Sequence, residues 1–253
     1  MHPIWVHSFF EMNLVFLKTG CCGFPVVKEK YAERLQVVEV QQTFYQPPKV
    51  STLENWRASM SEHFEFTLKA WQLITHTAKS PTYRRLKSKF TEAELAQCGA
   101  FQNTPMVQCA WETTLACAKA LAARRVLFQC PASFTPAPQN MGQMRHFFNT
   151  IERHDLMLLW EPRGNWPESL VFSLCQELNL VHVVDPFLSQ SVTPDSVYLR
   201  LHGGKNFKHI FSDEELRTVV RLIPPGKPAY IMFNNINMWE DARRFQLLTS
   251  QLE

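Results

Sequence analysis

Eight short apolar runs alternate with segments of helical composition along most of this chain. The runs cover residues 15–22, 36–42, 64–71, 126–130, 156–161, 180–185, 197–202 and 229–234. Each has the length and residue types of a buried strand. Strands that alternate with helices form a parallel sheet, and eight such units close into a barrel. The pattern therefore predicts an α/β fold, the (β/α)8 TIM barrel.

The segments between these runs supply the predicted helices, at residues 50–60, 113–123, 141–153, 168–178, 213–222 and 238–252. Ser212 and Glu215 have the spacing of a capping box that opens one of them. The connection over residues 72–125 is too long for a simple loop, so we expect an elaborated segment with at least two helices after the third strand. We expect one TIM-barrel domain over residues 14–253, preceded by an N-terminal extension over residues 1–13.

Composition and charge exclude several classes of protein. The chain has 253 residues, of which 45% are hydrophobic and 19% charged, and a formal charge of +3. This charge is well short of the Lys and Arg excess of a dedicated nucleic-acid binder. No uncharged apolar run is long enough to span a membrane, and the N-terminus lacks the pattern of a signal peptide. Seven cysteines, mostly within apolar runs, are typical of reduced thiols, so we expect a cytoplasmic protein without membrane contact.

Residues 37–45 read as a strand whose buried face carries a charge. Glu39 shares that face with Val37 and Gln41, because side chains alternate along an extended segment. A buried carboxylate without a partner costs several kcal/mol, on the order of 3–5. We therefore expect other strands to supply a polar interior.

The same alternation places polar residues at the C-terminal ends of the other strands. In the seventh run, Tyr198, Arg200 and His202 occupy one face and aliphatic residues the other. Enzymes with this architecture carry their active sites at that end of the barrel. The predicted catalytic residues are Glu39, Glu161 and His202, and the predicted substrate-binding residues are Lys69, Gln129, Arg163, Asp185, Arg200, Asn234 and Asn235.

These residues predict an enzyme that acts on an anionic, phosphorylated or sugar-like small molecule, by hydrolysis or isomerisation. Arginine and lysine would hold the anion, the carboxylates and His202 would transfer protons, and the amides would bind hydroxyls. The alternative for any one residue is an internal ion pair without a ligand, for example Glu39 with Lys69 or Glu161 with Arg200. An interior that served stability alone would have aliphatic residues at these positions. The polar residues taken together therefore favour a functional cavity.

Two further chemistries are open but disfavoured. A divalent metal could use the oxygen-rich set Glu39, Glu161 and Asp185 with His202, but three cations at the same strand ends compete for the carboxylates. Cys22, beside Cys21, could act as a nucleophile, although a pair of small residues at a tight turn is the more ordinary explanation.

The alternative function is nucleic-acid binding or processing. Its basis is the run from Tyr83 to Arg85 with Lys79, Lys87 and Lys89 nearby, which could follow a phosphate backbone. A solvated basic helix explains the same residues. A non-catalytic scaffold is the third reading.

The motifs, in their order along the chain, resemble the YecE-like family, domain of unknown function family 72. They are Gly20-x-x-Gly23, Val38-Glu39-Val40, Thr43-Phe44-Tyr45, Phe64-x-Phe66-x-x-Lys69, Ile74-Thr75-His76, Phe128-Gln129-x-Pro131, Glu161-x-Arg163, Tyr198-x-Arg200-Leu201-His202-Gly203 and Phe233-Asn234-Asn235. The chain departs from the family pattern at Cys21-Cys22, where Thr-Ser is usual, at Gln41, where Asn is usual, and at Gly164-Asn165, where His-Pro is usual. The resemblance implies a TIM barrel with its site at these motifs, and it implies no particular activity.

Overall fold

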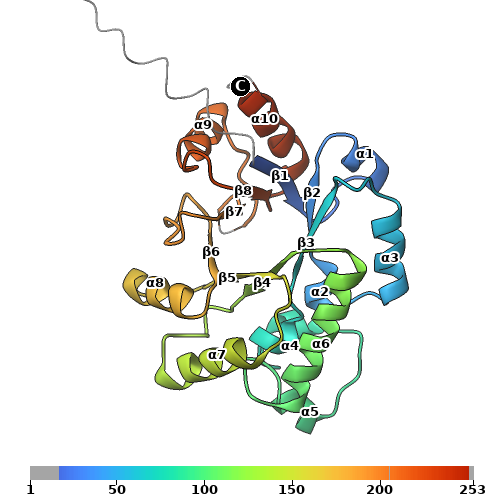
Figure 1. Cartoon of the computed structure of the whole chain (residues 1–253), viewed down its shortest axis with the longest axis vertical. Coiled ribbons are helices and arrows are strands. Elements are labelled where there is room, and N and C mark those ends of the chain that lie inside the picture. Colours follow the sequence, from blue (N-terminus) through green and yellow to red (C-terminus); the bar gives the residue numbers. More distant parts are fainter. Residues whose placement is uncertain (1–16, 205, 251–253) are drawn as a thin grey trace, which may run out of the picture. The chain divides into compact units, whose positions relative to one another are not determined.

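All eight predicted strands are present in the computed structural model, which describes residues 17–204 and 206–250 (Figure 1). They are β1 (Leu17–Cys22), β2 (Val37–Val40), β3 (Glu65–Lys69), β4 (Arg125–Gln129), β5 (Met157–Glu161), β6 (Val181–Val184), β7 (Val197–Leu201) and β8 (Ala229–Phe233). The strands pair in chain order as a closed barrel, which confirms the predicted TIM-barrel fold. The predicted extension over residues 1–13, and residues 15 and 16 of the first predicted strand, lie outside the described residues.

The six predicted helices are confirmed, and shorter ones join them. The helices are α1 (Lys28–Ala32), α2 (Gln42–Tyr45), α3 (Val50–Ala58), α4 (Gln72–Thr75), the 3₁₀ helix η1 (Pro81–Arg85), α5 (Glu92–Ala96), α6 (Pro105–Ala120), α7 (Pro138–Thr150), α8 (Glu168–Glu177), α9 (Asp213–Arg221) and α10 (Met238–Ser250). Both α6 and α7 begin earlier than predicted, because proline is favoured in the first turn of a helix. The capping box of Ser212 and Glu215 is confirmed at α9.

One predicted strand ends early. Residues 42–45, expected to extend the second strand, form α2 instead, which corrects that prediction. The Thr43 hydroxyl lies 2.7 Å from the Lys69 carbonyl oxygen and 3.1 Å from the Val40 carbonyl oxygen. A side chain thus contacts these carbonyl oxygens in place of the backbone amide of a longer β2. The chain therefore turns immediately after β2.

The elaborated connection after β3 contains α4, η1, α5 and α6, as predicted. It packs onto the segments that leave the C-terminal ends of β2 and β3. The Tyr83 hydroxyl donates to the His76 carbonyl oxygen at 2.7 Å, and the Arg85 guanidinium lies 3.6 Å from the centre of the Tyr45 ring. The connection thus lies beside the ends of these two strands.

The chain divides into two compact units by its internal contacts. The central unit runs from Val38 to Val183, and the terminal unit joins the chain up to Val37 with the chain from Val184 onward. Within the described residues, the central unit holds β3, β4, β5 and most of β2 and β6, and the terminal unit holds β1, β7 and β8.

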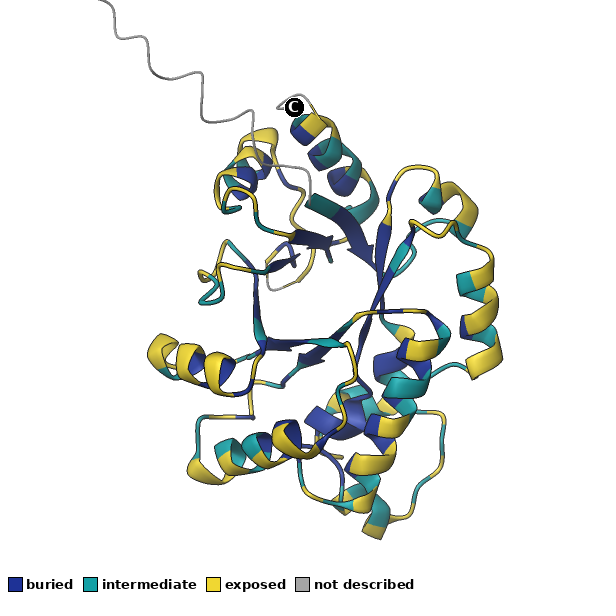
Figure 2. Ribbon diagram, in the orientation of Figure 1, coloured by how far each residue is buried: buried dark blue, intermediate teal, exposed yellow. Residues whose placement is uncertain are grey.

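In the central unit, β3, β4 and β5 pair in parallel and separate two kinds of side chain. On one face, Phe128 packs against Trp111 of α6 and against Phe147 and Phe148 of α7, with ring centroids 5.0–5.8 Å apart. Figure 2 shows the strands buried, while α6 and α7 each have a buried and an exposed side. The helices thus cover the aromatic face of these strands, and the polar strand ends belong to the other face.

In the terminal unit, β8 pairs with both β1 and β7, and α10 packs on β1 and β8. Strand β1 approaches Val37 closely at Gly20, where a Cβ atom would lie 2.2 Å from the Val37 carbonyl oxygen. The buried Tyr31 hydroxyl bridges the same two segments, because it accepts from the Cys21 amide at 2.7 Å and donates to the Val37 carbonyl oxygen at 2.8 Å. This contact needs glycine at position 20.

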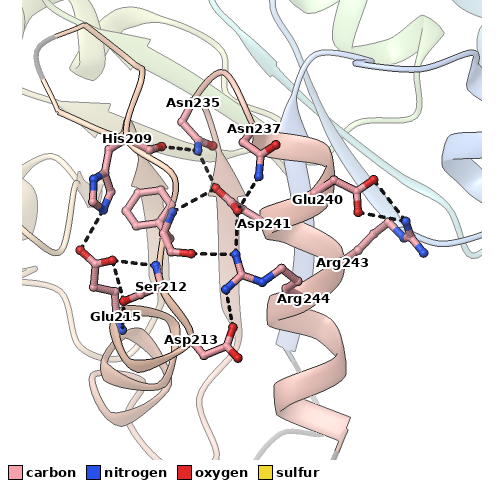
Figure 3. Close-up of polar contacts among 11 residues, drawn as sticks. His209, Ser212, Asp213, Glu215, Asn235, Asn237, Glu240, Asp241, Arg243 and Arg244 are labelled. Carbon is pink, nitrogen blue, oxygen red and sulfur yellow. Dashed lines mark hydrogen bonds and ion pairs between the residues drawn. The ribbon is translucent and has the colours of Figure 1, made fainter.

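A cluster of hydrogen bonds around Asp241 fixes the loops after β7 and β8 (Figure 3). Asp241 of α10 is fully buried and accepts from Asn235 at 2.7 Å and from Arg244 at 3.2 Å. Asn235 also donates to the His209 carbonyl oxygen at 2.8 Å, and Arg244 donates to that of Phe211 at 2.7 Å. The segment over residues 209–211 is therefore tied to α10.

The close approach at Gly20 gives a test of the strand packing. Gly20→Ala is expected to lower the free energy of unfolding by about 3 kcal/mol, since overpacking of this kind costs roughly 1–3 kcal/mol. In the matched variant Gly142→Ala, the new Cβ in α7 meets no atom within 4 Å, and we expect a gain of up to about 1 kcal/mol from helix propensity. Urea unfolding measures both, and equal effects of the two substitutions would contradict this packing.

Candidate functional site

Three consecutive strands of the central unit end in polar side chains that form a hydrogen-bonded row. Lys69, Gln129 and Glu161 are the last residues of β3, β4 and β5. The Lys69 Nζ donates to Gln129 Oε1 at 2.8 Å, and the Gln129 Nε2 donates to Glu161 Oε2 at 2.9 Å. Arg163 completes the row, with its Nη2 2.7 Å from Glu161 Oε1. We call these four residues the polar row.

The register of the strands explains how the row forms. Gln129 pairs with Glu161 across β4 and β5, and Lys69 pairs with Leu127 across β3 and β4. Alternation therefore puts Lys69, Leu127, Gln129, Leu159 and Glu161 on one face. The two leucines are almost fully buried and form an apolar layer behind the row.

Polar residues at the other end of the same strands have a different role. Arg125 and Glu65, which begin β4 and β3, form an ion pair with 3.5 Å between Nη1 and Oε2. This pair lies at the N-terminal ends, where TIM barrels carry residues for stability. The polar row lies at the C-terminal ends, where they carry their active sites.

Hydrogen-bond chemistry fixes the orientation of the row. Lysine and arginine side chains only donate, so the Gln129 oxygen must accept from Lys69 and both Glu161 oxygens accept from neighbours. The Glu161 side chain is 3% exposed and that of Arg163 is 35% exposed. Arg163 is therefore the accessible cation, and Glu161 is the shielded carboxylate beside it.

Aromatic and imidazole groups surround Lys69. Its Nζ lies 3.9 Å from the centre of the Phe44 ring, and the His76 ring meets the same phenyl ring edge-on at 5.0 Å. Burial, and then the charge of Lys69, lower the pKa of His76 to about 3. Burial also lowers the pKa of His182 to about 4, although the charge of Glu161 opposes this shift. Both imidazoles are neutral near pH 7.

The buried position expected for Glu39 is confirmed, since its side chain has no exposed surface. Gln41 Nε2 donates to Glu39 Oε1. Glu39 belongs to the central unit together with the polar row.

A second polar group lies in the terminal unit at the C-terminal ends of β1, β6 and β7. Asp185 Oδ2 accepts from the His202 amide at 3.0 Å and lies 3.4 Å from His202 Nδ1. Arg200 Nη1 lies 3.2 Å from His202 Nε2, and Arg200 Nη2 lies 3.5 Å from Cys22 Sγ. Because arginine can only donate, His202 Nε2 is the acceptor and its proton is on Nδ1, toward Asp185.

Burial and hydrogen bonding act in opposite directions on the acids and thiols of this unit. Burial raises the pKa of Asp185, but hydrogen bonds from His202 and Phe187 outweigh it and leave the pKa below its ordinary value. Burial raises the pKa of the Cys21 thiol to about 12. Cys21 is therefore a protonated, structural thiol.

The two asparagines that were predicted to bind substrate differ in their hydrogen bonds and exposure. The backbone N–H of Asn234 donates to the Leu201 carbonyl oxygen at 2.9 Å, and the Asn234 residue is partly exposed. Asn235 donates from Nδ2 to the His209 carbonyl oxygen and to Asp241, and its Oδ1 is buried. That the ten predicted residues share one cavity stays a prediction.

Phe44, His76 and His182 were not among the predicted catalytic or substrate-binding residues. Phe44 and His76 do belong to motifs on which the family resemblance rests, and they follow closely after β2 and β3. Across residues 17–204 and 206–250, no three His, Cys, Asp or Glu side chains group as metal ligands. In the same residues, no helix has the length and apolar character required to cross a bilayer.

Comparison with known proteins identifies the family. The model of "Protein of unknown function DUF72" matches residues 28–253, so the chain belongs to this family, and the resemblance drawn from its motifs is confirmed. No curated protein matches the chain.

Solved structures share the fold. A DUF72 family protein from Enterococcus faecalis V583 has a TM-score of 0.71 at 20% identity, with 95% of this chain and 99% of that chain covered. Another, from Thermotoga maritima MSB8, has a TM-score of 0.66 at 18% identity, with 93% and 99% covered. A xylose isomerase domain containing protein from Salmonella typhimurium LT2 has a TM-score of 0.57 at 13% identity, with 92% and 95% covered.

The two buried histidines make the fold acid-sensitive. At pH 5 their imidazoles stay neutral in the folded chain, whereas the unfolded chain, with a histidine pKa near 6.5, takes up the protons. Between pH 7.5 and 5, each should therefore reduce the free energy of unfolding by about 2 kcal/mol. Urea unfolding at both pH values should show that His76→Asn reduces the loss of stability between pH 7.5 and 5 by about 2 kcal/mol. Equal pH dependence in wild type and His76→Asn would contradict the assignment.

Proposed function

We propose that this DUF72 family member is an enzyme that acts on an anionic small molecule, phosphorylated or sugar-like, at the C-terminal ends of β3, β4 and β5. One observation supports this most strongly: a shielded carboxylate, Glu161, is held between Gln129 and an accessible Arg163. Each of the three strands contributes to the row at the end where barrel enzymes place their chemistry.

The cations of the row suit an anionic substrate. Arg163 contacts Glu161 through Nη2 and is 35% exposed, and its planar guanidinium is of the kind that binds phosphate. Lys69 adds a second positive charge behind Gln129. Gln129 keeps one N–H and one oxygen lone pair, which suit a sugar hydroxyl.

Glu161 is the proposed acid or base. Each of its oxygens accepts a hydrogen bond in the row, so a substrate that draws Gln129 or Arg163 away frees a lone pair of the carboxylate. A carboxylate shielded from water, beside bound substrate, can take a proton from a carbon or a hydroxyl and return it elsewhere. This chemistry serves isomerisation as well as hydrolysis.

His202, in the terminal unit, keeps its proposed role as a proton carrier. Asp185 Oδ2 lies 3.4 Å from the protonated Nδ1, and Nε2 accepts from Arg200. Uptake of a proton at Nε2 would leave two donors facing each other, so Arg200 would have to turn away. Protonation of His202 and orientation of Arg200 are therefore coupled in this proposal.

Calorimetric titration with phosphate and a small panel of sugar phosphates tests the proposal. Wild type is expected to bind at least one of them. Arg163→Ala should weaken that binding about ten- to a hundredfold, because a hydrogen bond to a charged group contributes about 1.5–3 kcal/mol. Glu161→Gln should bind as tightly or more tightly, since it removes a negative charge beside the anion.

Arg145→Ala is the matched control for the titration. Arg145 forms an ion pair with Glu177 on α8, 2.8 Å between the nearest atoms, far along α7 from the strand ends. Its loss should leave binding unchanged. Equal binding by wild type and Arg163→Ala would reject the polar row as the anion site.

Nucleic-acid binding is the second candidate function, because five basic residues close together in the long connection are all exposed. They are Lys79, Arg84, Arg85, Lys87 and Lys89, and the first acidic residue after them is Glu92. Five phosphate contacts would give a slope of about −4 for log affinity against log salt concentration. Fluorescence anisotropy with an oligonucleotide, in wild type and in Arg84→Gln/Lys87→Gln, measures this slope, and a flat salt dependence would reject this function.

A further inference from the structure

His76 is a buried imidazole with one ring nitrogen that no other group in the described residues engages. The residue follows α4, beyond the C-terminal end of β3, and is 6% exposed. Its Nδ1 lies 2.8 Å from the Thr75 hydroxyl. Within the described residues its Nε2 has no hydrogen-bond partner and keeps some contact with solvent. A molecule bound at this strand end can therefore reach Nε2.

The Thr75 hydroxyl fixes the tautomer of His76. Thr75 is 2% exposed, and in the described part of the chain its hydroxyl has no acceptor other than His76 Nδ1. A buried hydroxyl donates where an acceptor is within reach, so Nδ1 accepts and the ring proton is on Nε2. Burial, and then the charge of Lys69, lower the pKa of His76 to about 3, so the ring is neutral near pH 7. His76 thus presents one uncharged N–H donor.

A turn of unusual conformation holds the backbone at His76. Residues 99–101 are consecutive residues at positive φ, between 51° and 90°. Their amides donate to the carbonyl oxygens of residues 73–75 at 2.7–3.2 Å. A Cβ atom at Gly99 would lie 2.6 Å from the His76 carbonyl oxygen, and the Tyr83 hydroxyl donates to that oxygen at 2.7 Å. Residues other than glycine are strained at positive φ, and such strain gathers at ligand sites.

The His76 ring lies beside one end of the polar row. It meets the Phe44 ring edge-on, with 5.0 Å between centroids. Lys69 Nζ, the first group of the row, lies 3.9 Å from the centre of the same Phe44 ring. All three residues belong to the central unit. An N–H donor and an ammonium group thus flank one phenyl ring where the row begins.

We propose that His76 is a substrate-binding residue whose Nε2 donates a hydrogen bond to a carbonyl or hydroxyl oxygen in the sugar-like part of the substrate. This inference rests on the proposed function and names a further residue of the same site. An uncharged N–H donor suits an uncharged oxygen, whereas the Arg163 guanidinium suits the phosphate. His76 therefore contributes to the preference for a sugar phosphate over inorganic phosphate.

Calorimetric titration tests this role through the ratio of two affinities, that for a sugar phosphate and that for inorganic phosphate. A panel of pentose and hexose phosphates supplies the sugar phosphate. His76→Phe keeps an aromatic ring against Phe44 and removes the donor. Its ratio should fall about two- to tenfold, the contribution of one hydrogen bond between uncharged groups. The affinity for inorganic phosphate should stay as in wild type.

Thr75 offers a matched pair of variants that leave the imidazole in place. Thr75→Val removes the hydroxyl that fixes the tautomer, so its ratio should fall in the same direction as that of His76→Phe. Thr75→Ser keeps the hydroxyl and should keep the wild-type ratio. Nitrogen NMR of the histidine rings, with the His76 signals assigned by their loss in His76→Phe, should show the proton on Nε2 in wild type and in Thr75→Ser. Urea unfolding checks that each variant is folded.

Three results would overturn the inference. One is an unchanged ratio in His76→Phe. Another is an equal loss of affinity for both ligands in that variant, which would make His76 a structural residue. The third is a wild-type His76 with its proton on Nδ1.

Arg163→Ala separates this inference from the proposed function. It should weaken both ligands by the same factor and leave their ratio unchanged. If Arg163→Ala weakens binding while His76→Phe keeps the wild-type ratio, only the role of His76 is rejected. Absence of binding by wild type would reject the proposed function and the role of His76 together.

Discussion

A carboxylate buried at the end of a barrel strand must be satisfied, and this requirement organises the central unit. Glu161 is 2% exposed, and an unpaired charge there would cost on the order of 3–5 kcal/mol. Gln129 and Arg163 each donate to one of its oxygens, and Lys69 orients the amide. The same groups that make the charge tolerable also define a place where an anion and a proton donor or acceptor can meet.

Much of this site follows from the sequence, since period-two alternation needs only the strands and their direction. Lys69, Gln129 and Glu161 each close an apolar run, and parallel pairing brings such ends to one edge. Contacts between residues that are distant in the sequence could not be predicted in this way. Thr43 ends β2 by contacting the Lys69 carbonyl oxygen, 26 positions away, so no local pattern at residues 42–45 predicted α2. The neutral state of His76 likewise depends on its burial beside Lys69.

The exposed apolar side chains of the terminal unit show a second limit of sequence reasoning. Phe207 and Ile236 are ordinary core residues by type, and only tertiary packing leaves them exposed. The strand pairing establishes the barrel, and membership of the DUF72 family supplies no reaction, so the chemistry has to come from side-chain geometry. The polar row and the second polar group share one feature, a buried carboxylate that contacts a neighbouring side chain. Glu161 contacts Arg163, and Asp185 contacts His202.

A crystal structure of the protein soaked with a sugar phosphate that binds in solution would test the polar row most directly. The account predicts the phosphate within hydrogen-bond distance of Arg163 and a sugar hydroxyl within reach of Gln129 or Glu161. An ordered ligand elsewhere on the chain, with the row intact and untouched, would contradict it.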